Sequence, residues 1–143
     1  MRGPRRPAIL RAVSQQNVDT VLQAVEAVNR GEPESVRHLF DEDVLWEPAR
    51  SGIEGSYHGV QGMREWWADT RENFESFELK LEDVRDAGSG VLTIGTIHVR
   101  GTGSGAEAEV PIAAIWTFKD GRLVHFKDYG DRRVALKTAG LED

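Results

Sequence analysis

The stretch AEAEVPIAAIWTFKDGRLVHFKDYG, residues 106–130, decides the fold. Two runs rich in apolar residues, 106–118 and 122–129, flank the dipeptide Asp120-Gly121. An Asp-Gly pair between two such runs is a strong local signal for a tight turn that joins antiparallel strands. We therefore expect a β-hairpin here, and the remaining elements are placed relative to it.

The segments before this hairpin add further strands to the same sheet. Residues 77–82 alternate apolar side chains with Glu or Lys, which is the period of a strand with one face in water. Residues 91–100 form another apolar run, and a Gly-rich segment separates it from the hairpin. Short connections of this kind favour an antiparallel meander.

Helical periodicity dominates the first half of the chain. Apolar residues recur at helical spacing over 18–28 until Gly31, and Pro33 suits the first turn of a second, short helix. A third helix is expected from Val60, with a wide apolar stripe that runs to Phe74. The other expected elements are a strand at 44–46 ending at Pro48, a loop at 49–59, and a last helix from the N-cap Asp131 through Lys137, closed by Gly140.

Helices followed by an antiparallel sheet predict a single α+β domain with helices on one face of the sheet. A chain of 143 residues can bury one core, and we assign the domain to residues 14–143. Residues 1–13 carry four Arg and two Pro without a long apolar run, so they indicate a flexible basic arm rather than a secretory signal. No apolar run is long enough to span a membrane, and the expectation is a cytoplasmic protein without a membrane partner.

Composition narrows the classes of partner and cofactor. The chain has 18 Lys and Arg against 24 Asp and Glu, a net charge of -6 that argues against nucleic acid as a partner. The absence of Cys removes thiolate metal sites and cysteine nucleophiles. The four His lie in four different elements without the spacing of metal ligands. We therefore expect neither a metal nor a cofactor.

The end of the chain carries a local resemblance to a known family. Residues 120–124 (DGRLV), 128–132 (DYGDR) and 139–141 (AGL), with Ala135-Leu136 between them, are similar to the ending of many SnoaL-like domains of the NTF2-like superfamily. The order of elements extends the resemblance back to Gln15. It implies a cone-shaped antiparallel sheet wrapped around the N-terminal helices. Because this superfamily includes enzymes, binding proteins and assembly modules, the resemblance indicates fold more than function.

The loop of the hairpin decides which side chains point into the cone, because a shift of one residue moves every side chain to the other face. A three-residue loop at 119–121, a type I turn with Gly121 in the left-handed region, would turn Asp128 inward. A two-residue Asp-Gly turn would turn Asp128 outward. We favour the first loop because it gathers the apolar residues on one face. It pairs Ile112 with Asp128, Ala114 with Phe126, and Trp116 with Val124.

In the preceding hairpin, charge pairing selects the register. If Arg100 faces Glu107 and His98 faces Glu109, two cross-strand pairs of opposite charge form on the outer face. His98 is then a solvated partner of Glu109 rather than a catalytic residue. The same alternation turns Gly95, Ile97 and Val99 inward.

Asp128 is the one carboxylate that this register points into apolar surroundings. Burial would raise its pKa and suit it to act as a general acid or base. The alternatives are an ion pair with Arg100 or Lys127, or a cap on backbone groups at the rim. SnoaL-like cyclases and limonene-epoxide hydrolases have a catalytic Asp at what looks like this position. The other catalytic residues of the hydrolases are missing, which disfavours epoxide hydrolysis; in their places stand Gly95, Ile97, Trp46 and Pro48.

Aromatic and aliphatic side chains are expected to line the hollow, since such residues dominate apolar ligand sites. Trp67 lies in the middle of the stripe of the third helix, where a core role is the commoner explanation. Tyr57 can supply a hydroxyl at the rim. The candidate ligand-binding residues are Trp46, Tyr57, Met63, Trp67, Ile97, Ile112, Trp116 and Phe126.

Two functions of different class fit this pattern. The first is a cofactor-independent cyclase, isomerase or lyase in which Asp128 transfers protons on a small hydrophobic molecule. The second is a non-catalytic ligand-binding or assembly domain. We also expect a homodimer formed through the outer face of the sheet, where Ile115, Leu123 and Tyr129 lie among polar residues.

Overall fold

The computed structural model describes residues 8–48, 56–88 and 90–141. Its elements in chain order are α1 (Ala8–Asn29), η1 (Pro33–Leu39), β1 (Phe40–Glu47), β2 (Tyr57–His58), α3 (Gly59–Asn73), β3 (Phe74–Asp86), β4 (Gly90–Gly101), β5 (Glu107–Lys119), β6 (Arg122–Asp128) and α4 (Arg132–Thr138).

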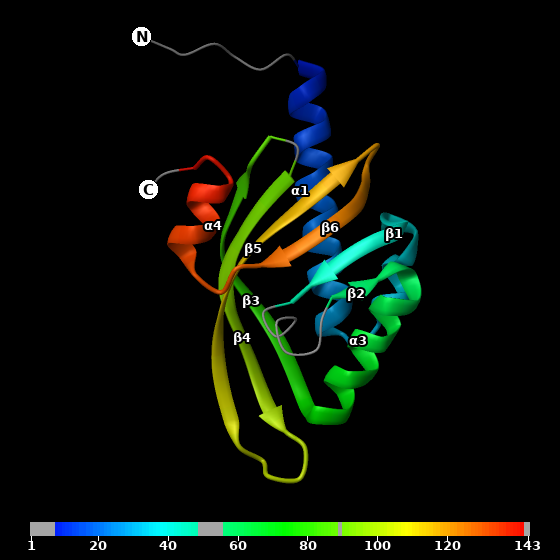
Figure 1. Ribbon diagram of the computed structural model, residues 1–143, viewed down its shortest axis with the longest axis vertical. Helices are drawn as coiled ribbons and strands as arrows, with labels where there is room; N and C mark the ends of the chain where they lie inside the picture. Colours follow the sequence, from blue (N-terminus) through cyan, green and yellow to red (C-terminus); the bar gives the residue numbers. More distant parts are fainter. Residues whose placement is uncertain (1–7, 49–55, 89, 142–143) are drawn as a thin grey trace.

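The strands form one six-stranded sheet in the order β2-β1-β6-β5-β4-β3. Neighbouring strands pair antiparallel except β1 and β6, which run parallel. Figure 1 shows this curved sheet with α1 and α3 on one side and α4 on the other. The fold is therefore a mixed α+β fold with a curved open sheet, which confirms the predicted class.

The core has two parts, one on each face of the sheet. The larger part lies between the sheet and α1, η1 and α3. The smaller part lies between the sheet and α4. Helices therefore cover both faces and not one, because β4 and β5 carry apolar residues on their outer side as well. The residues of the smaller part are Leu92, Ile94, Ala113, Ala135 and Leu136.

Several boundaries differ from the predicted ones. Helix α1 begins at Ala8, so part of the expected arm is helical, and no Gly or Pro interrupts the chain between Pro7 and Gly31. Residues 1–7 of the arm lie outside the described residues. Part of the expected loop at 49–59 is the short strand β2, whereas 49–55 is not described. Phe74 begins β3 instead of closing α3, because its backbone is extended and it pairs with β4.

The last helix has the two ends that the sequence predicts. Asp131 accepts a hydrogen bond through Oδ1 from the N–H of Val134 at 3.1 Å, which is an N-cap. At the other end Gly140 has a φ of 73°. The N–H of Leu141 then reaches back to the carbonyl of Leu136 at 2.8 Å, which satisfies a carbonyl in the last turn.

The turn between β5 and β6 is the two-residue turn, so the predicted three-residue loop is wrong. Asp120 and Gly121 have φ values of 53° and 79°, as a type I′ turn requires. Lys119 therefore pairs directly with Arg122. This turn matches the right-handed twist of the two strands, which a type I turn does only with an added bulge residue.

A two-residue turn alone would place Asp128 on the outer face of the sheet, and a β-bulge at Val124 returns it to the inner face. The register shifts just after the turn, so that Thr117 pairs with His125 and Val124 is left as the extra residue. Beyond the bulge, Asp128 pairs with Ala114. Asp128 consequently lies on the inner face, although by a different route from the one the sequence predicted.

The bulge changes which side chain is buried near the turn. Leu123 is fully buried inside the cone, whereas Val124 is half-buried, the reverse of the predicted arrangement. Ile115 and Tyr129 pack against the smaller core beside α4. Much of the apolar surface expected to form a dimer is thus covered within one chain. The homodimer stays a prediction, and the part of the outer face that remains for it is more polar than expected.

The register of β4 and β5 is the one that charge pairing predicts. Arg100 pairs with Glu107 and His98 with Glu109, and the His98 imidazole lies 3.3 Å from the Glu109 carboxylate. Gly95 faces inward, where a Cβ would come within 2.1 Å of the carbonyl oxygen of Lys80 on β3. Only glycine allows this close approach of the two strands.

Strand β3 is an outer strand of the sheet, and a side chain of α1 occupies part of its free edge. The amide nitrogen of Asn29 donates to the carbonyl of Leu79 at 2.9 Å, and the N–H of Leu79 donates to Asn29 Oδ1 at 2.9 Å. The side chain amide thus imitates one residue of a neighbouring strand. This contact ties the end of α1 to the sheet.

Candidate functional site

A cavity of about 170 Å³ lies between the inner face of the sheet and the helices α1, η1 and α3. Its wall is mostly apolar, with a few polar groups. The residues that line it are Ala24, Val25, Val28, Pro33, Val36, Phe40, Trp46, Pro48, Tyr57, Met63, Trp66, Asp69, Thr70, Asn73, Phe74, Phe77, Leu79, Ile97, Val99, Val110, Ile112, Trp116, Phe126 and Asp128.

A row of aromatic side chains crosses four neighbouring strands and forms one wall of this cavity. The register places Tyr57 of β2, Trp46 of β1, Phe126 of β6 and Trp116 of β5 side by side. Trp46 and Phe126 stack with ring centroids 3.9 Å apart, and Trp116 meets Phe126 edge-on at 4.7 Å. Such contacts fix the rings in place, so this wall is formed before any ligand arrives.

The two indole N–H groups of this wall differ. Trp116 Nε1 donates to the Thr93 hydroxyl at 2.9 Å. Trp46 Nε1 is buried and has no hydrogen-bond partner among the described residues. A buried donor without a partner is uncommon in proteins, so Trp46 is held here by packing rather than by polar contacts.

Asp128 lies one step along the inner face from the aromatic row, opposite Ala114. The residue is 8% exposed, and Oδ1 accepts hydrogen bonds from the N–H groups of Gly130 at 2.8 Å and Ala113 at 3.2 Å. Burial raises the pKa of Asp128, and the two backbone hydrogen bonds oppose this rise without cancelling it. Asp128 therefore keeps its proton to higher pH than an exposed aspartate does.

The basic residues that might have paired with Asp128 are engaged elsewhere. Arg100 forms an ion pair with Glu107 on the outer face. The ammonium group of Lys127 lies over the Tyr129 ring, 5.1 Å from its centroid. Across residues 8–48, 56–88 and 90–141, no side chain forms an ion pair with Asp128. The alternative of a neutralised structural carboxylate therefore finds no support, whereas the backbone contacts agree with the predicted cap.

Polar groups meet at the rim of the cavity. The Tyr57 hydroxyl donates to Asp69 Oδ2 at 3.0 Å, and Asp69 and Asn73 are exposed residues of α3 that reach the cavity wall. The rim hydroxyl predicted for Tyr57 is thus present. A ligand in this otherwise apolar site could form polar contacts with these groups at the rim.

The structure brings together eight of the nine predicted site residues, namely Trp46, Tyr57, Met63, Ile97, Ile112, Trp116, Phe126 and Asp128. Trp67 is the exception. Its ring lies 5.9 Å from that of Trp66, and the Arg71 guanidinium lies 5.8 Å from its centroid, but it does not line the cavity. Trp66 takes the inward place, along with Phe77.

The position of Trp66 had a signal in the sequence. Met63, Trp66, Thr70 and Asn73 follow one another at intervals of three or four residues, and all four line the cavity. This is the spacing of one face of a helix. Trp67, four residues after Met63, fits this spacing as well, so the spacing admits both tryptophans and does not decide between them.

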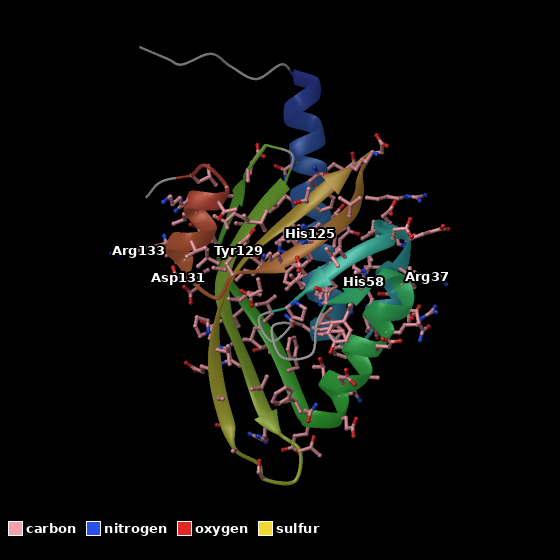
Figure 2. The ribbon with its side chains drawn as sticks, in the orientation of Figure 1. Arg37, His58, His125, Tyr129, Asp131 and Arg133 are labelled. Atoms are coloured by element: carbon pink, nitrogen blue, oxygen red, sulfur yellow. The ribbon has the colours of Figure 1, made fainter. Side chains whose placement is uncertain are left out.

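A second polar cluster lies on the outer face of the sheet, away from the cavity. His125 Nε2 is hydrogen-bonded to Glu47 Oε2 at 2.6 Å, and the Ser56 hydroxyl donates to Glu47 Oε1 at 3.1 Å. The hydrogen bond from His125 lowers the pKa of Glu47. The register places His58 of β2 and His125 of β6 on either side of Leu45 of β1, and both side chains are labelled in Figure 2.

The part of the chain that the structure describes contains no group of three or more His, Asp or Glu side chains arranged to hold a metal ion. Within that same part, no helix is both long and apolar enough to cross a membrane.

A curved sheet that encloses a ligand-sized hollow with helices, and that places one buried carboxyl in the hollow, defines a class of small α+β pocket proteins. The SnoaL-like domain matches residues 21–126 of the chain, which is well over half of it. The chain therefore belongs to the SnoaL-like family, as its C-terminal motifs predict.

Solved structures agree on the fold. An NTF2-like protein of unknown function from Burkholderia pseudomallei is 23% identical, with a TM-score of 0.73, and the match covers 85% of this chain and 95% of that one. A protein assigned as a SnoaL-like polyketide cyclase from Jannaschia sp. CCS1 is 20% identical, with a TM-score of 0.73, over 96% of both chains. An epoxide hydrolase resembling limonene-epoxide hydrolases, from M. tuberculosis, is 18% identical, with a TM-score of 0.68, over 86% of this chain and 88% of that one. No curated protein sequence matches the chain.

Proposed function

We propose that this SnoaL-like protein binds a small hydrophobic molecule and transfers protons on it through Asp128 without a cofactor, as a cyclase, isomerase or lyase does. The observation that carries the proposal is the carboxyl of Asp128, buried at an apolar cavity with a raised pKa and no ion-pair partner among the described side chains. A carboxyl with a raised pKa is better suited than an exposed one to hold a proton or take one during a reaction.

The hydrogen bonds to Asp128 support this role. Both backbone donors, Ala113 and Gly130, bond to Oδ1. Within the described part of the chain nothing bonds to Oδ2, so that oxygen is left for a ligand. The backbone thus fixes the orientation of the carboxyl while one of its oxygens can exchange a proton.

The wall of the cavity does not support hydrolysis by an activated water. Epoxide hydrolases of this fold couple their Asp to an Arg and a second Asp on a neighbouring strand. Here Gly95 and Ile97 occupy the inner positions of β4, and none of the described residues that line the cavity is Arg. A reaction in which one carboxyl both removes and returns a proton needs no such partner, which favours isomerisation, cyclisation or elimination.

The size of the cavity supports a ligand of one or two rings. An engineered protein cavity of about 150 Å³ binds benzene, and the cavity described here has about 170 Å³ with an open polar rim. Its aromatic wall suits a flat or cyclic hydrocarbon frame.

The proposal can be tested with nitrobenzisoxazole, a small aromatic probe of proton abstraction. A base removes the proton from its ring carbon, the N–O bond breaks, and the coloured cyanonitrophenolate forms while the proton stays on the base. We expect turnover that rises with pH as Asp128 ionises. Asp128→Asn should reduce the rate constant by about 100-fold or more, since general base catalysis contributes at least that much.

Glu47→Gln is the matched control. Glu47 is a carboxylate on the adjacent strand β1, but it faces the outer side of the sheet and pairs with His125. Its replacement should leave turnover unchanged. If Asp128→Asn keeps the wild-type rate, the proposal is wrong. If both proteins bind the probe equally and neither opens it, a non-catalytic ligand-binding protein replaces the proposed enzyme.

A further inference from the structure

Among the described residues, the charged groups of the cavity are all of one sign. Two carboxyl side chains, Asp69 and Asp128, line it, and none of the described wall residues is Lys, Arg or His. Buried charges in proteins are normally paired with an opposite charge. Within the described ranges the protein itself supplies no such charge to the deeper carboxyl, that of Asp128.

Basic side chains on the elements around this hollow are engaged elsewhere. Arg64 of α3 forms an ion pair with Glu34 of η1, and Arg71 of the same helix lies over the ring of Trp67, which is outside the cavity. On β6, the Lys127 ammonium lies over the Tyr129 ring. Among the described residues, an anionic ligand would therefore meet two carboxyl groups and no counter-charge.

The aromatic rings of the cavity wall attract positive charge. Trp66 and Phe77 meet edge-on with ring centroids 6.0 Å apart, and the ring of Trp66 lies 5.1 Å from that of Trp46 in the aromatic row on the sheet. The face of an aromatic ring carries partial negative charge, and it binds a desolvated cation by about 2 kcal/mol. Aromatic rings together with a carboxylate are the usual means by which proteins recognise methylated ammonium groups.

We propose that the ligand of this cavity is a small organic cation, a tertiary amine or a quaternary ammonium compound, whose charge lies between Asp128 and the aromatic wall. This names the ligand class for the site of the proposed function, and it rests on that function only in using the same cavity and the same carboxyl. Binding of a cation does not require that Asp128 also transfer a proton. The apolar part of such a ligand fills the hydrocarbon-lined end beside Ile97 and Ile112.

The affinity of the cavity for a cation should depend on pH. Protonation of Asp128 removes the charge that holds the cation, so acid weakens binding. The backbone of Ala113 and Gly130 and the side chain of Ala114 surround its carboxyl, and none of these titrates. Among the described residues, the other titratable groups that line the cavity are Asp69 and Tyr57.

The test compares choline with dimethylbutanol, the uncharged isostere in which carbon replaces nitrogen. Both are titrated into the full chain at constant ionic strength, and binding is followed by calorimetry and by the fluorescence of Trp46 and Trp116. We expect wild type at pH 8 to bind choline at least tenfold more tightly than dimethylbutanol, about 1.4 kcal/mol. Because the two molecules have one shape, this comparison isolates charge and needs no variant.

Three variants locate the effect. Asp128→Asn should lower choline affinity about tenfold while leaving dimethylbutanol affinity within about twofold. Glu47→Gln, on the outer face, should keep the preference for choline. As the pH falls, choline affinity should drop in wild type and in Asp69→Asn but stay constant in Asp128→Asn.

Equal affinity of the wild-type protein for the two molecules would overturn the inference, and so would the absence of choline binding. Choline binding that Asp128→Asn leaves unchanged would do the same. The outcomes are separate from those of the proposed function: opening of nitrobenzisoxazole without a preference for choline refutes the cation and keeps proton transfer. A preference for choline without opening of that probe does the opposite.

Discussion

Replacement of Leu123 by Ala tests the bulge that turns Asp128 into the cavity. Leu123 is fully buried because the two-residue turn pairs it with Phe118 on the inner face. Truncation of a core leucine costs about 2.7–5.0 kcal/mol, from lost burial and from the space left behind. We expect about 3 kcal/mol here, which lowers the melting temperature by roughly 10 °C in a domain of this size.

Val124→Ala is the matched control. Val124 is the neighbouring residue, the extra one of the bulge, and it is half-buried. Its truncation removes less apolar surface from a site that can relax, so it should cost less than about 1 kcal/mol. Urea unfolding, followed by tryptophan fluorescence and by circular dichroism, gives both free energies.

The order of these two costs decides the register. In the three-residue loop that the sequence favoured, Val124 would face inward and Leu123 would face water. Truncation of Leu123 would then change stability by about 0.5 kcal/mol or less. A larger cost for Val124→Ala than for Leu123→Ala would refute the two-residue turn with its bulge.

Three further replacements test the site and its frame. Asp128→Asn should raise stability relative to wild type at neutral pH. Burial raises the pKa of Asp128 in the folded protein above 3.8, so wild type loses stability as the pH rises from 3.8 through the folded pKa. Urea unfolding across a pH series should show that the gain of the variant vanishes in acid. Gly95→Ala should cost about 3 kcal/mol or more in the same assay, because the new Cβ would lie 2.1 Å from the Lys80 carbonyl oxygen. Thr93→Val should cost about 1–3 kcal/mol by leaving Trp116 Nε1 without its acceptor, and Thr93→Ser should restore most of it in thermal unfolding.

The elements with strong periodicity were predictable from the sequence. The alternation of residues 77–82 and the caps of α4 depend on neighbours in the chain, and the structure has both. The register of β4 and β5 followed from two cross-strand charge pairs, Arg100 with Glu107 and His98 with Glu109. These signals are local, or they join residues that one short loop brings together.

The bulge at Val124 was not predictable in this way. Asp120 and Gly121 suit the two-residue turn, but that turn alone would have exposed Asp128, so the sequence argument chose another loop to keep it inside. The structure has the two-residue turn, and the extra residue Val124 of β6 forms a bulge that returns Asp128 to the inner face. A bulge depends on how a whole strand packs against the core, for which a turn motif carries no information.

The candidate site was predictable where strand alternation governs it and less so on the helix. Trp46, Trp116 and Phe126 share a face because strand residues two apart point the same way. For α3 the prediction placed Trp67 in the wall, whereas Trp66 lines the cavity. Two adjacent tryptophans differ by about 100° around a helix, and a wide apolar stripe includes both.

The two hydrogen bonds between the Asn29 side chain and the backbone of Leu79 should limit self-association at high protein concentration. An uncovered strand edge recruits strands from other molecules, which is a common start of aggregation. Asn29 occupies both backbone groups of Leu79 in the middle of β3, and the charged side chains of Glu78 and Lys80 flank that point. Loss of this amide would therefore appear first as self-association of folded molecules, before any weakening of the individual chain could be measured.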